Sequence, residues 1–243
     1  MEIKLELCIL LIIVGLVACF VQRVSGFGLG VLSMLILPHF FVSHTAPAAI
    51  VCLCSCVTSS YNTIRYRRNI PYKTSLPMII SALCVIPFAI YFSAKVSKEV
   101  FNVILGITLV ILSVFLLFFS KKIKLKPTLA KGVSVGIFGG ALNGLFASGG
   151  PPAVLYLSQA TTSKENYFAG IQFYFAVCNI FATIMRIING ILRLEHLLYA
   201  GIGLIGCLVG DIFGRRVFNK LDGEKIKLII YVGMIISGII MII

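Results

Sequence analysis

Two short tracts rich in glycine and proline interrupt otherwise apolar stretches of this sequence. Residues 25–30 read Ser-Gly-Phe-Gly-Leu-Gly, and residues 148–152 read Ser-Gly-Gly-Pro-Pro. Glycine adopts backbone conformations that other residues resist, and proline lacks an N–H donor and disfavours a helical conformation in the residue before it. Within a membrane, such irregular backbone persists only where protein buries it or where it lines a wet cavity. The tracts therefore predict two helix breaks at a binding site.

The chemistry around these tracts favours a negatively charged ligand. A helix that begins after a glycine turn presents free N–H groups and the positive end of its dipole, equivalent to roughly half a unit charge. Helices that begin near Gly28 and Pro152 would direct these ends at the breaks. Arg23 could bind an oxyanion in bidentate fashion, and Ser25 and Ser148 add hydroxyl groups. We therefore expect a small anionic substrate.

Polar residues in nearby apolar segments complete the predicted site. Asn143 precedes the second tract, and Gln172 and Asn179 share one helix face because they are seven residues apart. These amides either line the cavity or form hydrogen bonds between helices. The predicted substrate-binding residues are Arg23, Ser25, Gly26, Phe27, Gly28, Gly30, Asn143, Ser148, Gly149, Gly150, Pro151 and Gln172.

Close helix packing is the alternative explanation for these glycines. It is the favoured explanation for the scattered Gly201, Gly206 and Gly210. It does not account for the Pro151-Pro152 pair, nor for the matching positions of the two tracts.

Other kinds of chemistry are not indicated by the sequence. It contains no nucleotide-binding loop and no nucleophile, zinc or paired-carboxylate constellation, so we predict no enzyme, no catalytic residue, no metal and no cofactor. The eight cysteines lie within apolar stretches, where they act as small packing residues. No acidic residue lies mid-span, which leaves the coupling ion unknown; Asp211 is expected to pair with Arg215.

The composition places most of the chain in lipid. Of the 243 residues, 59% are hydrophobic and 12% are charged, and the mean hydropathy is +1.06. The net charge of +13 comes from basic residues clustered in short gaps between apolar runs. Such clusters are typical of cytoplasmic loops and do not favour a nucleic-acid partner.

The order of the apolar segments predicts an all-α polytopic membrane protein with two inverted repeats, residues 1–124 and 125–243. Each repeat would contain a broken or re-entrant helical hairpin and three transmembrane helices. Three segments are short for a span of about 20 residues: 28–42, 132–147 and 152–159. The expected segments are 7–22, 28–42, 45–64, 75–94, 100–119, 132–147, 152–159, 167–188, 197–214 and 228–243.

Charge favours the inverted arrangement. If each broken pair returns to its starting side, the loops at 65–73, 120–131, 161–166 and 215–227 are all cytoplasmic. These loops hold 15 of the 21 basic residues. Both termini then lie outside. A parallel arrangement would expose the basic loop 215–227 to the exterior.

The order of these motifs resembles the sulfite exporter TauE/SafE family, also called the toluene-sulfonate uptake permeases. The resemblance covers essentially the whole chain, although the family usually clusters three glycines in each tract. It rests on the following motifs: the two tracts, Pro38, Gly139-Gly140, the basic run 65–68, and the late helix with Gly206 and Gly210 that ends in Gly214-Arg215-Arg216.

The resemblance implies transport of small organosulfur or related anions, such as sulfite, sulfonates or a sulfoacetate-like compound, across a prokaryotic plasma membrane. The paired helix breaks predict a secondary transporter that works by alternating access, with the lipid bilayer as its surroundings. Two alternatives remain open at this point: a passive anion channel, and a membrane scaffold or subunit that does not transport. The oligomeric state is unknown, with a homodimer as one option.

Overall fold

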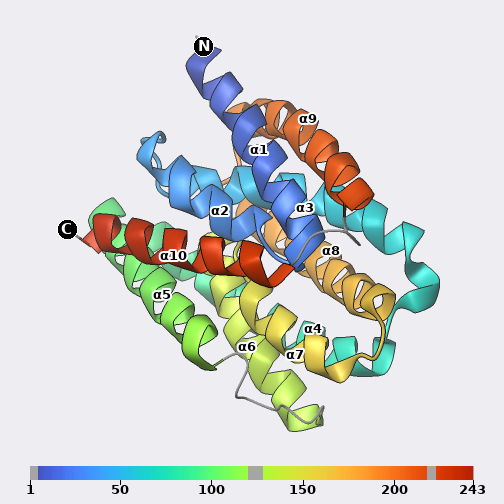
Figure 1. Ribbon diagram of the computed structural model, residues 1–243. Coiled ribbons are helices and arrows are strands. Elements are labelled where there is room, and N and C mark those ends of the chain that lie inside the picture. The colour runs from blue at the N-terminus through green and yellow to red at the C-terminus, as the bar shows by residue number, and fades with distance from the viewer. Residues whose placement is uncertain (1–4, 120–127, 218–222, 243) are drawn as a thin grey trace.

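The computed structural model describes residues 5–119, 128–217 and 223–242, without the side chains of residues 119, 217, 223–227, 229 and 230. All regular structure in these ranges is helical (Figure 1). The elements are α1 (Leu5–Ser25), α2 (Leu29–Ile36), η1 (Leu37–His39), α3 (Ala46–Arg65), η2 (Arg67–Asn69), α4 (Tyr72–Lys95), α5 (Lys98–Phe119), α6 (Leu129–Phe146), α7 (Gly150–Ala160), α8 (Lys164–Ile188), α9 (Leu194–Val217) and α10 (Gly223–Ile242).

Each of the ten predicted segments corresponds to one α-helix. Seven described helices are long and apolar enough to cross a membrane: α1, α3, α4, α5, α6, α8 and α9. The expectation that residues 132–147 are too short was wrong. Their helix, α6, begins at Leu129 because the Thr128 hydroxyl accepts a hydrogen bond from the backbone N–H of Lys131, at 3.4 Å. Large parts of the predicted loops 120–131 and 215–227 lie outside the described residues.

The distribution of side chains is that of a protein surrounded by lipid. Large apolar side chains face outward, with Phe88 76% exposed and Phe138 69% exposed, whereas Arg186 is 2% exposed and Asn143 and Ser59 are fully buried. In water, exposure of so many apolar side chains would be unfavourable. In a bilayer the apolar side chains contact lipid, while the polar side chains are buried among the helices. The chain is therefore a multi-pass membrane protein.

Helices from the two halves of the chain pack in matching pairs. The helix before the first break, α1, packs along α9, and the helix before the second break, α6, packs along α4 (Figure 1). In addition, α3 packs against α8 and α5 against α10. If α1–α5 are assigned to α6–α10 in order, exchanging the halves reproduces this set of pairs.

The directions of these helices follow from the residues that meet. On α3 and α8, Cys52 contacts Thr183 whereas Tyr66 contacts Phe168, so these two helices are antiparallel. On α5 and α10, Gly106 lies near Met241 and Gly238 lies near Val110, which is again antiparallel. In each of these two pairs, the two corresponding helices therefore run in opposite directions.

Glycines bring α1 and α9 close together. A methyl group at Gly206 or Gly210 would collide with the carbonyl oxygen of Ile12 or Leu16 respectively, so the prediction of a packing role is confirmed for both. It was wrong for Gly201, where an added methyl group meets nothing within 4 Å. Gly201 is exposed on α9, away from the other helices among the described residues.

Candidate functional site

The first helix break occupies residues 26–28, between α1 and α2. Gly26 has a φ of 90°, a left-handed conformation that favours glycine. The hydroxyl of Tyr167 covers this turn and donates a hydrogen bond to the carbonyl oxygen of Ser25, at 3.1 Å. After the turn, the Gln22 side chain accepts a hydrogen bond from the backbone N–H of Leu29, at 3.1 Å, and so caps the start of α2.

The second break occupies residues 147–149, between α6 and α7. Ala147 has a φ of 53° and ends α6 in a left-handed conformation. Pro151 and Pro152 lie in the first turn of α7, where a helix tolerates residues that lack an N–H. Ala147 therefore ends α6, and the two prolines favour the start of α7.

The two breaks touch each other. A methyl group at Gly30 would collide with the carbonyl oxygen of Ala147, and one at Gly150 would lie 2.9 Å from Cβ of Phe27. Glycine is required at both positions because the two backbones cross at this point. The crossing joins segments that are about half the chain apart in sequence.

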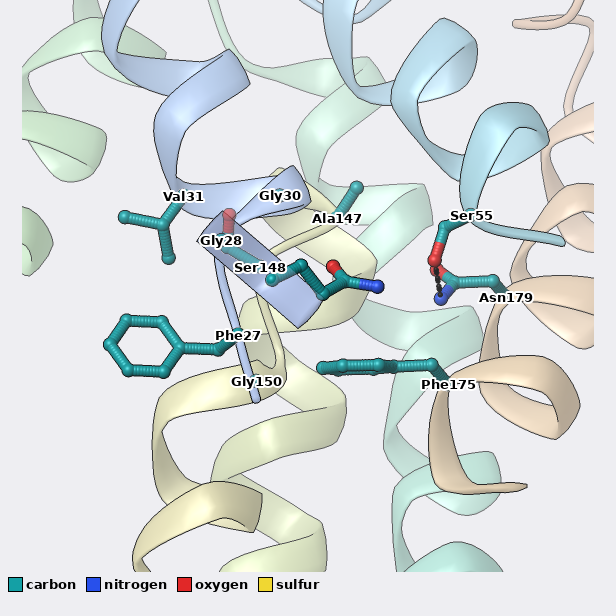
Figure 2. Close-up of a pocket in the computed structure, with 11 residues that line it drawn as sticks. Phe27, Gly28, Gly30, Val31, Ser55, Ala147, Ser148, Gly150, Phe175 and Asn179 are labelled. Carbon is teal, nitrogen blue, oxygen red and sulfur yellow. Dashed lines mark hydrogen bonds between the residues drawn. The ribbon is translucent and has the colours of Figure 1, made fainter. Parts of the chain in front are cut away.

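A small cavity of about 10 Å³ lies at the crossing (Figure 2). This volume is about that of the space needed for one water molecule. The broken segments form one side, and Ser55 of α3 with Asn179 and Phe175 of α8 form the other. The lining residues are Gln22, Phe27, Gly28, Gly30, Val31, Ser55, Ala147, Ser148, Gly150, Phe175 and Asn179.

Amide and hydroxyl groups form a connected network beside the cavity. The Asn179 side chain donates to the Ser55 hydroxyl at 3.0 Å and accepts from the Asn143 amide, also at 3.0 Å. Asn143 thus positions Asn179 without itself lining the cavity. Because Asn179 lies at the meeting point of α3, α6 and α8, its orientation depends on all three helices.

Residues from the first turns of α2 and α7 also line this space. In the first turn of a helix the N–H groups have no acceptor within the helix, and Gly30 and Val31 occupy this turn in α2. In α7 only Gly150 has such an N–H, because the next two residues are prolines. The two helix starts were predicted near Gly28 and Pro152, and the structure places them at Leu29 and Gly150.

The structure brings together part of the predicted site. Phe27, Gly28, Gly30, Ser148 and Gly150 line the cavity. That these residues bind a substrate remains a prediction.

Other predicted residues lie beside the cavity. Gly26 and Gly149 shape the breaks and lie under the hydroxyls of Tyr167 and Tyr174 respectively. The Ser25 hydroxyl lies within hydrogen-bonding distance of the carbonyl oxygens of Val21 and Phe27, so it closes the local turn.

Pro151 and Gln172 face other surroundings. Pro151 lines an apolar space between α5, α6 and α7. Gln172 is 1% exposed and is not among the residues that line the cavity.

Arg23 lies in the last turn of α1, away from the cavity lining. Its guanidinium donates to the Asn62 side chain at 3.1 Å and to the Tyr66 hydroxyl at 2.6 Å. It stacks over Phe168 with its central carbon 4.0 Å from the ring centre, and lies 3.9 Å from the Asp211 carboxylate. Its part in substrate binding remains a prediction.

The expected pairing of Asp211 with Arg215 is confirmed, at 2.7 Å. This ion pair lies at the end of α9, where it is joined to Arg23 through the same carboxylate. The charge of Asp211 is therefore shared between two guanidinium groups.

Several lining residues were not predicted from the sequence. Gln22, Val31, Ser55, Ala147 and Phe175 were absent from the predicted set. Asn179 was also outside it, although lining the cavity was one of the two roles considered for this residue. A polar spacing provided one usable signal: Ser55, Ser59 and Asn62 recur at four and then three residues, on one face of a helix. Gln22, Ala147 and Phe175 carry no comparable signal.

Comparison with known proteins identifies the chain through one family. The family model described as sulfite exporter TauE/SafE matches residues 11–241, which is nearly the whole chain. No curated protein and no solved structure matches this chain. The family match confirms the resemblance inferred from the order of the sequence motifs.

Proposed function

Because the chain belongs to the sulfite exporter TauE/SafE family, we propose that it is a secondary transporter of small organosulfur or related anions. Sulfite, sulfonates and sulfoacetate-like compounds are the candidate substrates. The observation that carries this proposal is the meeting of two helix breaks at one buried polar cavity. Paired broken helices of this kind form the substrate sites of many membrane transporters.

The sign of the substrate charge follows from the groups around the cavity. Amides and hydroxyls come from Gln22, Ser55, Ser148 and Asn179, and none of the lining residues is a carboxylate. The first-turn N–H groups of α2 and α7 add the positive ends of two helix dipoles. This collection of donors supports an anion and disfavours a metal cation.

Transport through this site requires movement. A cavity of about 10 Å³ is too small for a sulfite ion, which has one sulfur and three oxygen atoms. We propose that the site opens alternately to each side as the two halves, 1–124 and 125–243, move against each other. The antiparallel packing of α3 with α8 and of α5 with α10 supports an inverted relationship between these halves.

An unequal packing of the two halves supports the same movement. On one side, α10 packs on α1 and α2. On the other, an apolar space of about 580 Å³ separates α5 from α6 and α7. In alternating access between inverted repeats, the two conformations differ by exchanging such arrangements.

We place the protein in a prokaryotic plasma membrane with its basic loops in the cytoplasm and both termini outside. The clustered lysines and arginines support this orientation through the positive-inside rule.

Flux measurements on reconstituted protein test the proposal. Purified protein in liposomes should move radiolabelled sulfite or methanesulfonate with saturable kinetics, and unlabelled anion on the opposite side should accelerate exchange. Single-channel currents without counterflow would instead identify a passive channel. If no member of a panel of sulfonates and carboxylates is transported or stabilises the fold, the substrate proposal is wrong.

One glycine tests whether the crossing is the site of transport. We expect Gly30→Ala to lower the flux strongly, because its methyl group would push the second break away at Ala147. Gly233→Ala is the matched control, since the added methyl group makes only an ordinary contact with Leu35 at 3.8 Å. Equal flux in the two variants would move transport away from the crossing.

A further inference from the structure

A row of polar side chains extends from the cavity in both directions along the interface of α3 and α8. The two helices are antiparallel and meet at the cavity, where Asn179 donates to Ser55. Residues four and seven positions further along each helix stay on the same face. Because the helices are antiparallel, these residues extend the row toward one end of the bundle on α3 and toward the opposite end of the bundle on α8. This α3–α8 seam consists of Asn62, Ser59, Ser55, Asn179, Thr183 and Arg186.

Hydrogen bonds connect much of the seam. The Ser55 and Ser59 hydroxyls are 3.4 Å apart on α3. On the other side of the cavity, the Cys52 thiol lies 3.4 Å from both the Asn179 side-chain oxygen and the Thr183 hydroxyl. The seam is thus a nearly continuous polar path through an otherwise apolar helix bundle, with the cavity near its middle.

A buried guanidinium lies at each end of the seam, and the two differ in their partners. Arg23 binds Asn62 at one end and lies near the Asp211 carboxylate. Arg186 lies at the other end, two residues before α8 ends, and is 2% exposed. Among the described residues, no ion pair includes Arg186.

The hydrogen bonds of Arg186 leave one side of its guanidinium available. Nη2 donates to the carbonyl oxygens of Asn143 and Gly144, at 3.3 and 2.9 Å, in the last turn of α6. Nη1 has no hydrogen-bond partner among the residues that the structure describes. The thiols of Cys52 and Cys56 are its neighbours on α3, and the weakly polar Cys52 thiol interacts with the guanidinium without forming a regular hydrogen bond to Nη1.

A buried cation of this kind needs compensation. Charges within transmembrane segments are costly and are usually paired, or else lie on the path of a substrate or ion. The carbonyl groups at the end of α6 supply only the partial negative charge of a helix terminus. A guanidinium with an unused donor is well suited to an oxyanion, which accepts two parallel N–H bonds.

We propose that Arg186 binds the transported anion, at the end of the α3–α8 seam opposite Arg23. The anion passes from the cavity along Asn179 and Thr183 and reaches Nη1 of Arg186 before it leaves the protein. This inference rests on the proposed function and adds a second binding position to it. The same movement that opens the cavity toward this end exposes the guanidinium.

Three substitutions at the surface and in the seam test this assignment with sodium sulfite as the probe, or methanesulfonate if the parental protein prefers it. Arg186→Met removes the charge but keeps a long side chain that fills most of the same space. Arg186→Lys keeps the positive charge but cannot donate the two parallel N–H bonds of a guanidinium. Arg193→Gln is the control, because the Arg193 side chain is 73% exposed.

We expect Arg186→Met to lower the initial rate of uptake into liposomes about 10- to 100-fold, as for loss of a hydrogen bond to a charged group. The rise in melting temperature caused by the anion should shift to higher anion concentration by a similar factor. Arg186→Lys should restore part of the uptake rate and part of the anion affinity seen in the melting temperature. Arg193→Gln should match the parental protein in both measurements. A purely structural Arg186 would lower the melting temperature without changing the concentration dependence.

A second variant keeps the test decisive if Arg186→Met does not fold. Cys56 lies next to Arg186 and 3.3 Å from Thr183, so Cys56→Asp places a carboxylate beside the guanidinium. This carboxylate should pair with Arg186, stabilise the fold and compete with the anion, which lowers uptake relative to Cys56→Ser.

The outcomes separate the two proposals. If the parental protein neither transports nor binds an anion, both are wrong. If it transports, and either Arg186→Met or Cys56→Asp stays within about twofold of its reference in rate and concentration dependence, only the role of Arg186 is overturned.

Discussion

At the scale of single residues, one wall of the cavity is organised by the side-chain amide of Asn179. Asn179 uses its side-chain nitrogen for Ser55 and its oxygen for Asn143. Asn179, Ser55 and Asn143 are all uncharged, so this hydrogen-bond network brings no net charge to the cavity. A substrate that enters the cavity therefore meets a neutral wall on this side, with helix N-termini opposite.

This arrangement makes Asn179→Asp a test of the substrate charge. Aspartate has the same shape but adds a negative charge beside the anion, which should lower its affinity about tenfold or more through like-charge repulsion. Sulfite uptake as a function of concentration measures the effect. Asn189→Asp, on an exposed residue just after α8, is the control. Improved uptake in Asn179→Asp would indicate a cationic substrate.

At the scale of elements, the two short helices differ in the way that they begin. The first turn of α2 is capped by the Gln22 side chain, whereas in the first turn of α7 Gly150 is followed by two prolines that lack an N–H donor. The α2 side therefore provides more backbone N–H groups than the α7 side. The two breaks are alike in position but unequal in their capacity to bind an anion.

The packing of α1 against α9 leads to a prediction about stability. Gly206→Ala should lower the melting temperature, because its methyl group collides with the backbone of Ile12. Gly201→Ala, on the same helix, should leave it unchanged or raise it, since alanine is favoured over glycine by about 1 kcal/mol in a helix interior. Thermal unfolding in detergent compares the two variants. Equal melting temperatures would show that α1 and α9 are not held at this contact.

At the scale of the whole molecule, the apolar exterior and the antiparallel pairs α3–α8 and α5–α10 constrain the topology. Asn69 and Asn166 are joined by a hydrogen bond of 3.4 Å, so η2 and the start of α8 lie at the same end of the bundle. His44 and Ser93, also joined by a hydrogen bond, place the start of α3 beside the end of α4. From the basic run 65–68, the positive-inside rule predicts that the first of these ends is the cytoplasmic one.

Reporter fusions test this orientation. Alkaline phosphatase, which is active only outside the cytoplasm, should be active when fused after residue 44, 189 or 243 and inactive after residue 69 or 163. A fluorescent protein that folds only in the cytoplasm should give the reciprocal pattern. Phosphatase activity after residue 69, or none after residue 243, would contradict the inverted arrangement of the two halves.

The sequence by itself determined the class of the protein, its ten helical segments and the two breaks. These features depend on composition and on local backbone preferences, since apolar runs must be helical in lipid and glycine and proline tracts interrupt them. The helix starts at Leu29 and Gly150 follow from the same local rules. The family resemblance rested on the order of these motifs, and the family match confirms it.

Only the tertiary structure decided which side chains meet at the cavity. Ser55 and Phe175 line it because α3 and α8 cross next to the breaks, a contact between residues more than 100 positions apart. Arg23, adjacent to the first tract in sequence, lies away from the lining because the last turn of α1 directs it toward α3 and α9. Helix direction and packing angle decide such contacts, and neither is encoded in local spacing.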